Sequence, residues 1–147
     1  MAGRAIRKRR NAAEMAGTRG ADELGPYLLL PPGNKREAVG ESNYQEALER
    51  ISGGRTREGA NLKVIARLVP DLDNPYDSNA VSVRVAGQVV AYLPRSEAKQ
   101  VHAKLTKLRE GVGCDIACRG LIVGGWKRGF LGRDQGHFGI KIDFADL

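Results

Sequence analysis

The chain of 147 residues has few cysteines, histidines and aromatic residues, and these shortages limit its chemistry. The two cysteines, Cys114 and Cys118, are four positions apart, which matches neither a zinc site nor a redox-active pair. In a strand they would share one face, so we interpret them as buried apolar residues. His102 and His137 are isolated, and neither is paired with a visible nucleophile. We predict no metal site.

Long hydrophobic runs are also missing. The longest uncharged apolar runs, such as residues 27–32, are far shorter than the roughly 20 residues of a membrane-spanning helix. The basic N-terminus is not followed by the apolar stretch of a secretory signal. We expect a soluble protein with no membrane partner, cytoplasmic, or nucleoid-associated if the source is bacterial.

The patterns of catalytic and cofactor sites are absent as well. No serine–histidine or cysteine–histidine pairing is in reach, and no glycine-rich phosphate loop precedes Lys-Ser or Lys-Thr. Asp71, Asp73 and Asp77 suggest a calcium loop but lack its glycine and its bidentate glutamate. We therefore predict a protein that is not an enzyme, has no cofactor and takes no small-molecule substrate.

Positive charge is abundant but unevenly distributed. The chain carries a formal net charge of +7, which favours an anionic partner. Residues 1–36 hold eight basic and three acidic residues, whereas the sixteen basic and fourteen acidic residues of 37–147 leave only +2. We expect residues 1–22 to be a disordered basic arm, because they show no apolar periodicity. Its Arg7, Lys8, Arg9 and Arg10 would add non-specific phosphate contacts, or the arm is only a solubilising extension.

Hydrophobic periodicity assigns residues 23–147 to one mainly β (α+β) domain. Alternation predicts strands at 27–30, 62–69, 81–85, 89–91, 114–123 and 137–144. A Ser42-x-x-Gln45 capping box predicts a helix that ends at Gly53-Gly54, and a second helix follows Pro94 with Ser96 as its cap. We expect a small curved barrel of five or six strands, of OB or SH3-like type, with the two short helices packed against it.

Between the predicted strands 62–69 and 81–85 lies the polar loop 71–80, which is stiffened by Pro70 directly before it and Pro75 within it. Its Asp, Asn and Ser side chains can each bond nearby backbone, which gives the loop a fixed shape. A rigid loop would present Asn74, Tyr76 and Asp77 to solvent. In the alternative interpretation, Asp77 only caps a turn and Tyr76 is a half-buried packing residue.

A second unusual segment is the glycine-rich stretch 124–136. Its Trp126, Lys127, Arg128, Phe130 and Arg133 are the residue types that stack on bases and bind phosphates, so we expect a mobile loop of that function. Alternatively, Trp126 and Phe130 cover the mouth of the barrel.

The order of these motifs resembles that of a HIRAN domain. The matching segments are Val39–Tyr44, Leu68–Val81 and Gly87–Pro94, and the most specific is Asn-Pro-Tyr-Asp-Ser-Asn-Ala-Val at 74–81. The resemblance implies a small barrel that grips single-stranded DNA, at a free 3′ end in the best-understood members. Those members carry it as a recruitment module on fork-remodelling translocases of the SWI/SNF class, which act in DNA repair and at replication forks.

The resemblance also implies roles for individual residues. Tyr76 would stack on the terminal bases, Asp77 would accept the 3′-hydroxyl proton, and Asn74 would brace the loop or contact the nucleotide. Arg95 matches a basic position close to the phosphates, with Lys99 on the same helix, and Tyr92 stands where DNA-binding relatives have a histidine. Those relatives also have an arginine followed by an aromatic residue where this chain has Ser42-Asn43, although Tyr44 is adjacent.

Two functions from different classes remain. The first is a module that binds single-stranded DNA, with its 3′ end as the ligand. The second is an adaptor in a repair, replication or phage assembly that keeps the fold without end recognition and docks its basic arm on a protein partner. The near-neutral charge of residues 37–147 favours the second.

Overall fold

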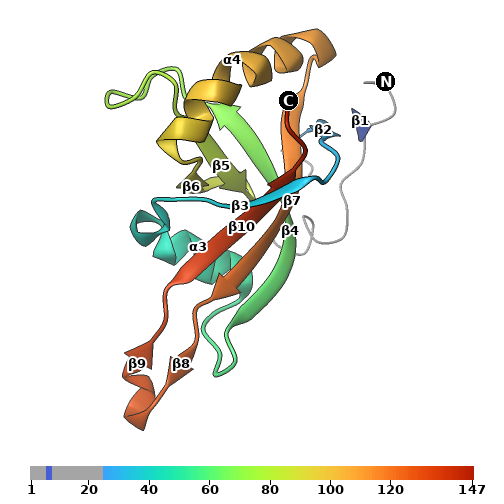
Figure 1. Ribbon diagram of the computed structural model, residues 1–147. Helices are drawn as coiled ribbons and strands as arrows, with labels where there is room; N and C mark the ends of the chain where they lie inside the picture. Colours follow the sequence, from blue (N-terminus) through green and yellow to red (C-terminus); the bar gives the residue numbers. More distant parts are fainter. Residues whose placement is uncertain (1–5, 8–24) are drawn as a thin grey trace.

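The protein, seen here in a computed structural model, is described over Ile6–Arg7 and residues 25–147 (Figure 1). It is mainly β with two helices, as the sequence predicts. The predicted disordered arm, residues 1–22, lies outside the described residues apart from Ile6 and Arg7. These two form β1 (Ile6–Arg7), which pairs antiparallel with Leu28 and Tyr27 of β2 (Tyr27–Leu29).

One sheet holds most of the remaining strands. They are β3 (Asn34–Glu37), β4 (Ala60–Pro70), β5 (Val81–Val85), β6 (Gln88–Tyr92), β7 (Asp115–Gly124) and β10 (Phe138–Phe144). The order is β1-β2-β7-β4-β5-β6, while β10 pairs with both β7 and β3. The predicted hairpin of β5 and β6 turns at Ala86-Gly87, where both residues have positive φ, as a two-residue turn of this kind requires.

Two helices pack on this sheet. After the short 3-10 turn η2 (Glu41–Asn43), α3 (Gln45–Ser52) contacts β6 and β10, and α4 (Arg95–Val112) contacts β4 and β7. Both end at a glycine with positive φ, Gly53 and Gly113. The core between sheet and helices includes Leu28, Leu48, Val64, Leu68, Val83, Val90, Leu105, Ile116, Ile122, Ile140 and Phe144. Neither described helix has the length and apolar character needed to cross a membrane.

The expected barrel needs correction, because the sheet is not closed. β6 meets the segment that follows β3 only at one bridge, where Val39 and Tyr92 exchange two backbone hydrogen bonds of 2.8 Å. β3 was not predicted, because its sequence Asn-Lys-Arg-Glu has no apolar alternation. It forms through its pairing with Lys141–Phe144 of β10, an interaction between distant parts of the chain.

Both predicted helix caps are also wrong. Ser42 lies in η2, and α3 starts after Tyr44 without a side-chain cap. Gln45 is instead used across the fold: its side-chain amide donates to Phe138 O and its carbonyl accepts from Phe138 N. The Gln45 side chain therefore continues the hydrogen bonding of β10 past the residues that pair with β3. Ser96 is not a cap either, because α4 begins at Arg95 directly after Pro94.

The antiparallel pairing of β4 with β7 positions the two segments of functional interest. It runs from Ala60 opposite Gly124 to Leu68 opposite Ile116. The carboxyl end of β4 leads into the loop 71–80, and that of β7 leads into a hairpin of β8 (Lys127–Arg128) and β9 (Asp134–Gln135). The loop and the hairpin therefore lie at opposite ends of the sheet (Figure 1). The strand β4 that separates their bases is about 30 Å long at the rise of a β-strand.

Gly125, at the base of this hairpin, tests the packing. Its φ is +69°, and a Cβ there would collide with the Phe138 ring. We expect Gly125→Ala to lower the free energy of unfolding by about 2 kcal/mol or more, measured by urea denaturation.

The matched control is Gly111→Ala. Gly111 lies in α4 with open space around it, so an added methyl group should be neutral or stabilise the protein by up to about 1 kcal/mol. Equal effects of the two substitutions would contradict the described hairpin base.

Candidate nucleic-acid interface

The loop 71–80 is closed at its base by backbone hydrogen bonds. Asp71 N donates to Ala80 O at 2.8 Å, and Ala80 N donates to Asp77 O at 3.1 Å. The loop projects beside the start of α4 (Figure 1). The first bond holds the two ends of the loop together and the second closes a turn within it, so both act inside the loop itself.

Asn74 organises the tip of the loop. Its Oδ1 accepts from the backbone N–H groups of Tyr76 at 2.9 Å and Asp77 at 3.0 Å, and its Nδ2 donates to Asp71 Oδ2 at 3.3 Å. The side chain thus satisfies backbone donors that would otherwise need water. Of the two expectations for Asn74, the geometry favours the brace.

Tyr76 and Asp77 differ strongly in exposure. Tyr76 is 86% exposed, so its ring is not a packing residue. The Asp77 side chain is 19% exposed: its Oδ1 accepts from Asn79 N at 2.9 Å, and its Oδ2 lies 3.6 Å from Arg95 Nε. Asp77 therefore does cap a turn, as the alternative interpretation holds, but only with one of its two oxygens.

Basic residues lie beside this loop. Arg95, the first residue of α4, has a 76% exposed side chain, and its guanidinium also donates to Tyr76 O at 3.4 Å. Lys99 follows one turn later and is exposed. Residues four apart on a helix share a face, so both positive charges lie on the same side of α4.

Tyr92 links the loop to the sheet. Its hydroxyl donates to Asp71 Oδ2 at 3.2 Å, and its ring centroid lies 6.3 Å from that of Tyr44. Burial, followed by Tyr44 and Asp71, raises the pKa of Tyr92 from 10.0 to about 12. Tyr44 is half-buried and Asn43 is exposed in η2. Tyr92 therefore anchors the loop at Asp71, and Tyr44 lies beside Tyr92.

The other predicted binding residues are at the far end of the sheet. Lys127, Arg128 and Phe130 are exposed on the hairpin of β8 and β9, and the half-buried Trp126 lies under Arg128, whose guanidinium carbon is 4.8 Å from the ring centroid. This segment is thus a paired hairpin, not the loop that we expected. Phe130 is 76% exposed and covers no opening of the sheet. Of the arm residues, Arg7 is in β1, and Lys8, Arg9 and Arg10 lie outside the described residues.

Sequence reasoning missed two residues at this end, Arg57 and Leu131, whereas Arg133 was among the stacking and phosphate-binding residue types of the predicted loop. Arg57, Leu131 and Arg133 are all exposed around the hairpin. Arg128 Nε donates to Arg57 O at 2.9 Å, and the Arg133 guanidinium carbon lies 5.9 Å from the centroid of the Phe130 ring. Leu131 belongs to a segment already singled out by composition. Arg57 could not be found locally, because the pairing of β4 with β7 brings it there.

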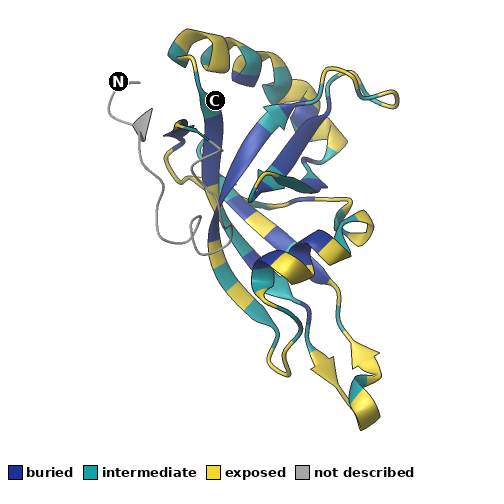
Figure 2. Ribbon diagram, turned by 180° about the vertical axis from the view of Figure 1, so that it is seen from behind, coloured by how far each residue is buried: buried dark blue, intermediate teal, exposed yellow. Residues whose placement is uncertain are grey.

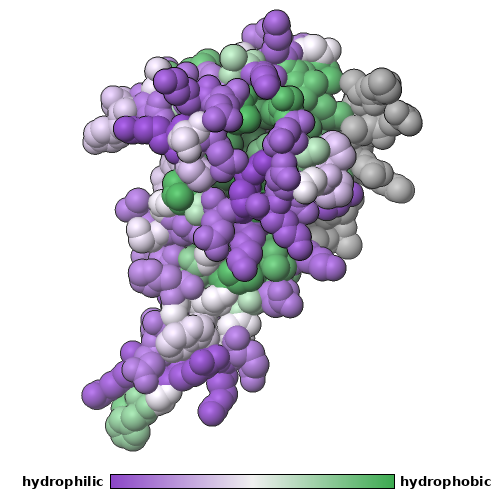
Figure 3. All heavy atoms as spheres, in the orientation of Figure 1, coloured by the Kyte–Doolittle hydropathy of each residue, from purple (hydrophilic) through white to green (hydrophobic). Residues whose placement is uncertain are grey.

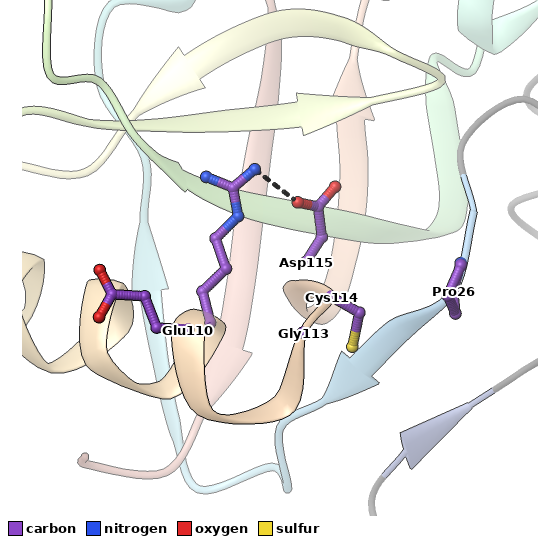
Figure 4. Close-up of a pocket in the computed structure, with 6 residues that line it drawn as sticks. Pro26, Glu110, Gly113, Cys114 and Asp115 are labelled. Carbon is purple, nitrogen blue, oxygen red and sulfur yellow. Dashed lines mark ion pairs between the residues drawn. The ribbon is translucent and has the colours of Figure 1, made fainter.

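A surface hollow of about 480 Å³ lies between the end of α4 and the start of β7 (Figure 4). Its lining consists of Pro26, Arg109, Glu110, Gly113, Cys114 and Asp115. Asp115 uses both carboxylate oxygens, one at 3.2 Å from Arg109 and the other at 3.2 Å from the buried Arg67. These charges therefore tie α4, β4 and β7 together.

The two cysteines differ in burial. Cys118 is fully buried in the core, where burial raises the pKa of its thiol to about 12. Cys114 is half-buried in the wall of the hollow, and both thiols are free. The interpretation of the cysteines as buried apolar residues is thus confirmed for Cys118 and holds only in part for Cys114.

Comparisons of the chain with family models, curated proteins and solved structures returned no match. The HIRAN likeness therefore rests on the segments named above and stays a prediction.

The raised pKa of Tyr92 predicts how stability depends on pH. The folded state holds the phenolic proton more tightly than the unfolded state, so this contribution is complete below about pH 10 and is lost as the pH rises to about 12. Urea denaturation of the parent and of Tyr92→Phe at about pH 9 and pH 11.5 measures it. We expect the stability advantage of the parent to shrink at the higher pH; an unchanged difference would contradict the raised pKa.

Removing the brace tests the origin of the loop conformation. We expect Asn74→Ala to cost about 1–2 kcal/mol of stability and to speed hydrogen exchange at the Tyr76 and Asp77 amides, which lose their acceptor. Ser78→Ala, an exposed position in the same loop, is the control. Unchanged exchange at both amides would show that Asn74 is not the brace.

Proposed function

We propose that this protein is a non-catalytic nucleic-acid-binding module that grips single-stranded DNA at a free 3′ end, acting in the cytoplasm or on the nucleoid. The observation that carries the proposal is the 86% exposed Tyr76 on a loop fixed by its own hydrogen bonds. An exposed ring of this kind is a stacking surface that accepts any base, worth about 1–3 kcal/mol per base.

The carboxylate beside the ring favours a terminus over a continuous strand. Within residues 25–147, Asp77 Oδ2 makes no hydrogen bond with the main chain, and it faces Arg95 Nε at 3.6 Å. A carboxylate accepts a hydrogen bond from a 3′-hydroxyl but repels a phosphate, which a continuing strand would place there. Arg95 and Lys99 would then neutralise the phosphates just before the terminal nucleotide.

The loop is suited to binding because it is already ordered. Asn74 holds the backbone at Tyr76 and Asp77, and Tyr92 holds Asp71. Binding therefore does not have to offset the conformational entropy that a flexible loop loses when it becomes ordered, which is a large cost.

The contacts between distant segments agree with the HIRAN likeness. Val39 and Tyr92 bridge two of the matching segments, and Tyr92 bonds Asp71 of the third. The same bridge brings the edge strand β6 next to the segment that follows β3, a contact that a variant of the HIRAN barrel would also need. All three matching segments thus meet at Tyr92, next to the proposed site.

A second candidate function is an adaptor in a repair, replication or phage assembly, with the basic arm docked on a protein partner. The observation that favours it is the net charge of only +2 over residues 37–147. In that case the loop would bind no DNA, and any affinity for DNA would come from the arm.

Binding titrations with a labelled single strand test the proposal. We expect the parent to bind a strand with a 3′-hydroxyl about tenfold more tightly than the same strand with a 3′-phosphate. Tyr76→Ala should weaken binding of both by about 5- to 100-fold through lost stacking. Asp77→Asn keeps an oxygen for the Asn79 amide but removes the charge, so it should abolish the preference for the hydroxyl end.

Leu72→Ala is the matched control, because Leu72 is also exposed on this loop. It should bind as the parent does. Equal affinity of the parent for both ends would exclude the role of Asp77, and a Tyr76→Ala variant with parental affinity would exclude stacking. Binding that disappears when residues 1–22 are removed would favour the adaptor.

A further inference from the structure

The hairpin of β8 and β9 projects from the body of the molecule, and its surface is exposed along its length (Figure 2). Its tip, the short turn η3 (Phe130–Gly132), carries two apolar side chains, Phe130 at 76% and Leu131 at 75% exposure. In Figure 3 this end shows a hydrophobic tip on a hydrophilic stem. Large apolar residues so exposed at the end of a projecting ribbon indicate a partner.

The backbone at the tip is also unusual. Leu131 has φ 57° and ψ 25°, the left-handed region that glycine or asparagine adopts more readily. Glycine at this position would remove both the strain and the exposed apolar surface. A leucine that is strained and exposed has no role in the packing of the fold, since it contributes nothing to the core.

The stem of the hairpin is basic. Lys127, Arg128 and Arg133 outnumber Asp134 on the hairpin, and Arg57, which is followed by the exposed Glu58, lies beside them. Within residues 25–147 none of these four cations is in an ion pair, and two of them lie near aromatic rings, Arg128 near Trp126 and Arg133 near Phe130. The cations that flank the apolar tip therefore favour a polyanion over an apolar protein surface.

The base of the hairpin is held firmly. Lys127 N donates to Thr56 O at 2.8 Å, Gly136 N donates to Trp126 O at 3.0 Å, and an Arg55 guanidinium nitrogen donates to Gly136 O at 2.6 Å. The segment before β4 thus fixes the hairpin to the sheet. A fixed ribbon can insert its tip into a partner without first becoming ordered.

We propose that this hairpin binds double-stranded DNA, with Phe130 and Leu131 as a wedge between base pairs and the basic residues of the stem on the flanking phosphates. A two-stranded ribbon fits a DNA groove, and apolar side chains at such tips unstack base steps while nearby lysines and arginines bind the backbone. The inference goes beyond the 3′-end grip and does not depend on it.

A duplex without ends separates the two surfaces. The probe is a 20-base-pair DNA dumbbell closed at both ends, with 2-aminopurine in its stem, titrated with the full chain and compared with a single strand that has a free 3′-hydroxyl. We expect the parent to bind the dumbbell and to raise 2-aminopurine fluorescence by unstacking. The double variant Phe130→Ala/Leu131→Ala should lose about tenfold or more in dumbbell affinity and the fluorescence change, and should bind the single strand as the parent does.

Tyr76→Ala is the reciprocal control, because it should weaken single-strand binding and leave the dumbbell unaffected. Leu131→Gly keeps or raises thermal stability by relieving strain, yet should weaken dumbbell binding, which distinguishes a lost wedge from a damaged fold. Lys127→Ala should lower the salt dependence of dumbbell binding by about one unit of slope.

Dumbbell binding and 2-aminopurine fluorescence that are unchanged in the tip variant would overturn the proposal. So would insertion of the tip into anionic phosphatidylserine vesicles without any unstacking of the dumbbell, because the tip would then be a membrane contact. If the loop variants fail their own test but the tip variants behave as stated, the hairpin inference stands and the 3′-end grip falls.

Discussion

The pairing of β4 with β7 is the constraint on which the rest of the structure depends. Its register, Ala60 opposite Gly124 to Leu68 opposite Ile116, turns Val64, Ala66 and Leu68 into the core together with Ile116, Cys118 and Ile122. A slip of one residue would turn these side chains to the opposite face, where the smaller cluster of Tyr27, Leu29, Ile65 and Ala117 packs, so burial fixes the register. Gly120 contributes to this fit, since a Cβ there would lie only 3.1 Å from Val64. The same register fixes where each strand ends, and hence where the loop 71–80 and the hairpin of β8 and β9 begin.

Local hydrogen bonds then decide what the loop offers to a ligand. Asn74 and Asp71 satisfy the polar groups of the turn, and Tyr92 ties Asp71 to the sheet. With those groups satisfied, no other interaction among the described residues draws the Tyr76 ring inward, and the ring is 86% exposed. An exposed aromatic ring is unfavourable in water, so its position here is set by the rigid backbone beneath it rather than by its own solvation.

The sequence was sufficient wherever the cause of structure is local. Alternation predicted β4, the hairpin of β5 and β6 and the inward face of β10, and turn chemistry predicted an exposed Tyr76. It failed where the cause lies elsewhere in the chain: the polar β3 exists because β10 pairs with it, and Gln45 bonds Phe138 rather than capping its own helix. The predicted binding residues lie at two ends of the sheet for the same reason. The segments that carry them follow β4 and β7, and the pairing of these two strands sends the segments to opposite ends.

The charge of the domain has a different meaning once these positions are known. Asp71, Asp73 and Asp77 make the loop acidic, with Arg95 and Lys99 beside it, whereas the hairpin carries a basic excess. Across the length of β4, about 30 Å and several Debye lengths at physiological salt, the two surfaces do not cancel each other's fields. The sum of +2 therefore describes neither of them, and it is weak evidence against binding of nucleic acid. The two proposed ligands, a 3′ end and a stretch of duplex, are different parts of one DNA molecule and would require different surfaces. The acidic loop would reject a continuing phosphate at the 3′ end, and the basic hairpin would attract the phosphates of the duplex.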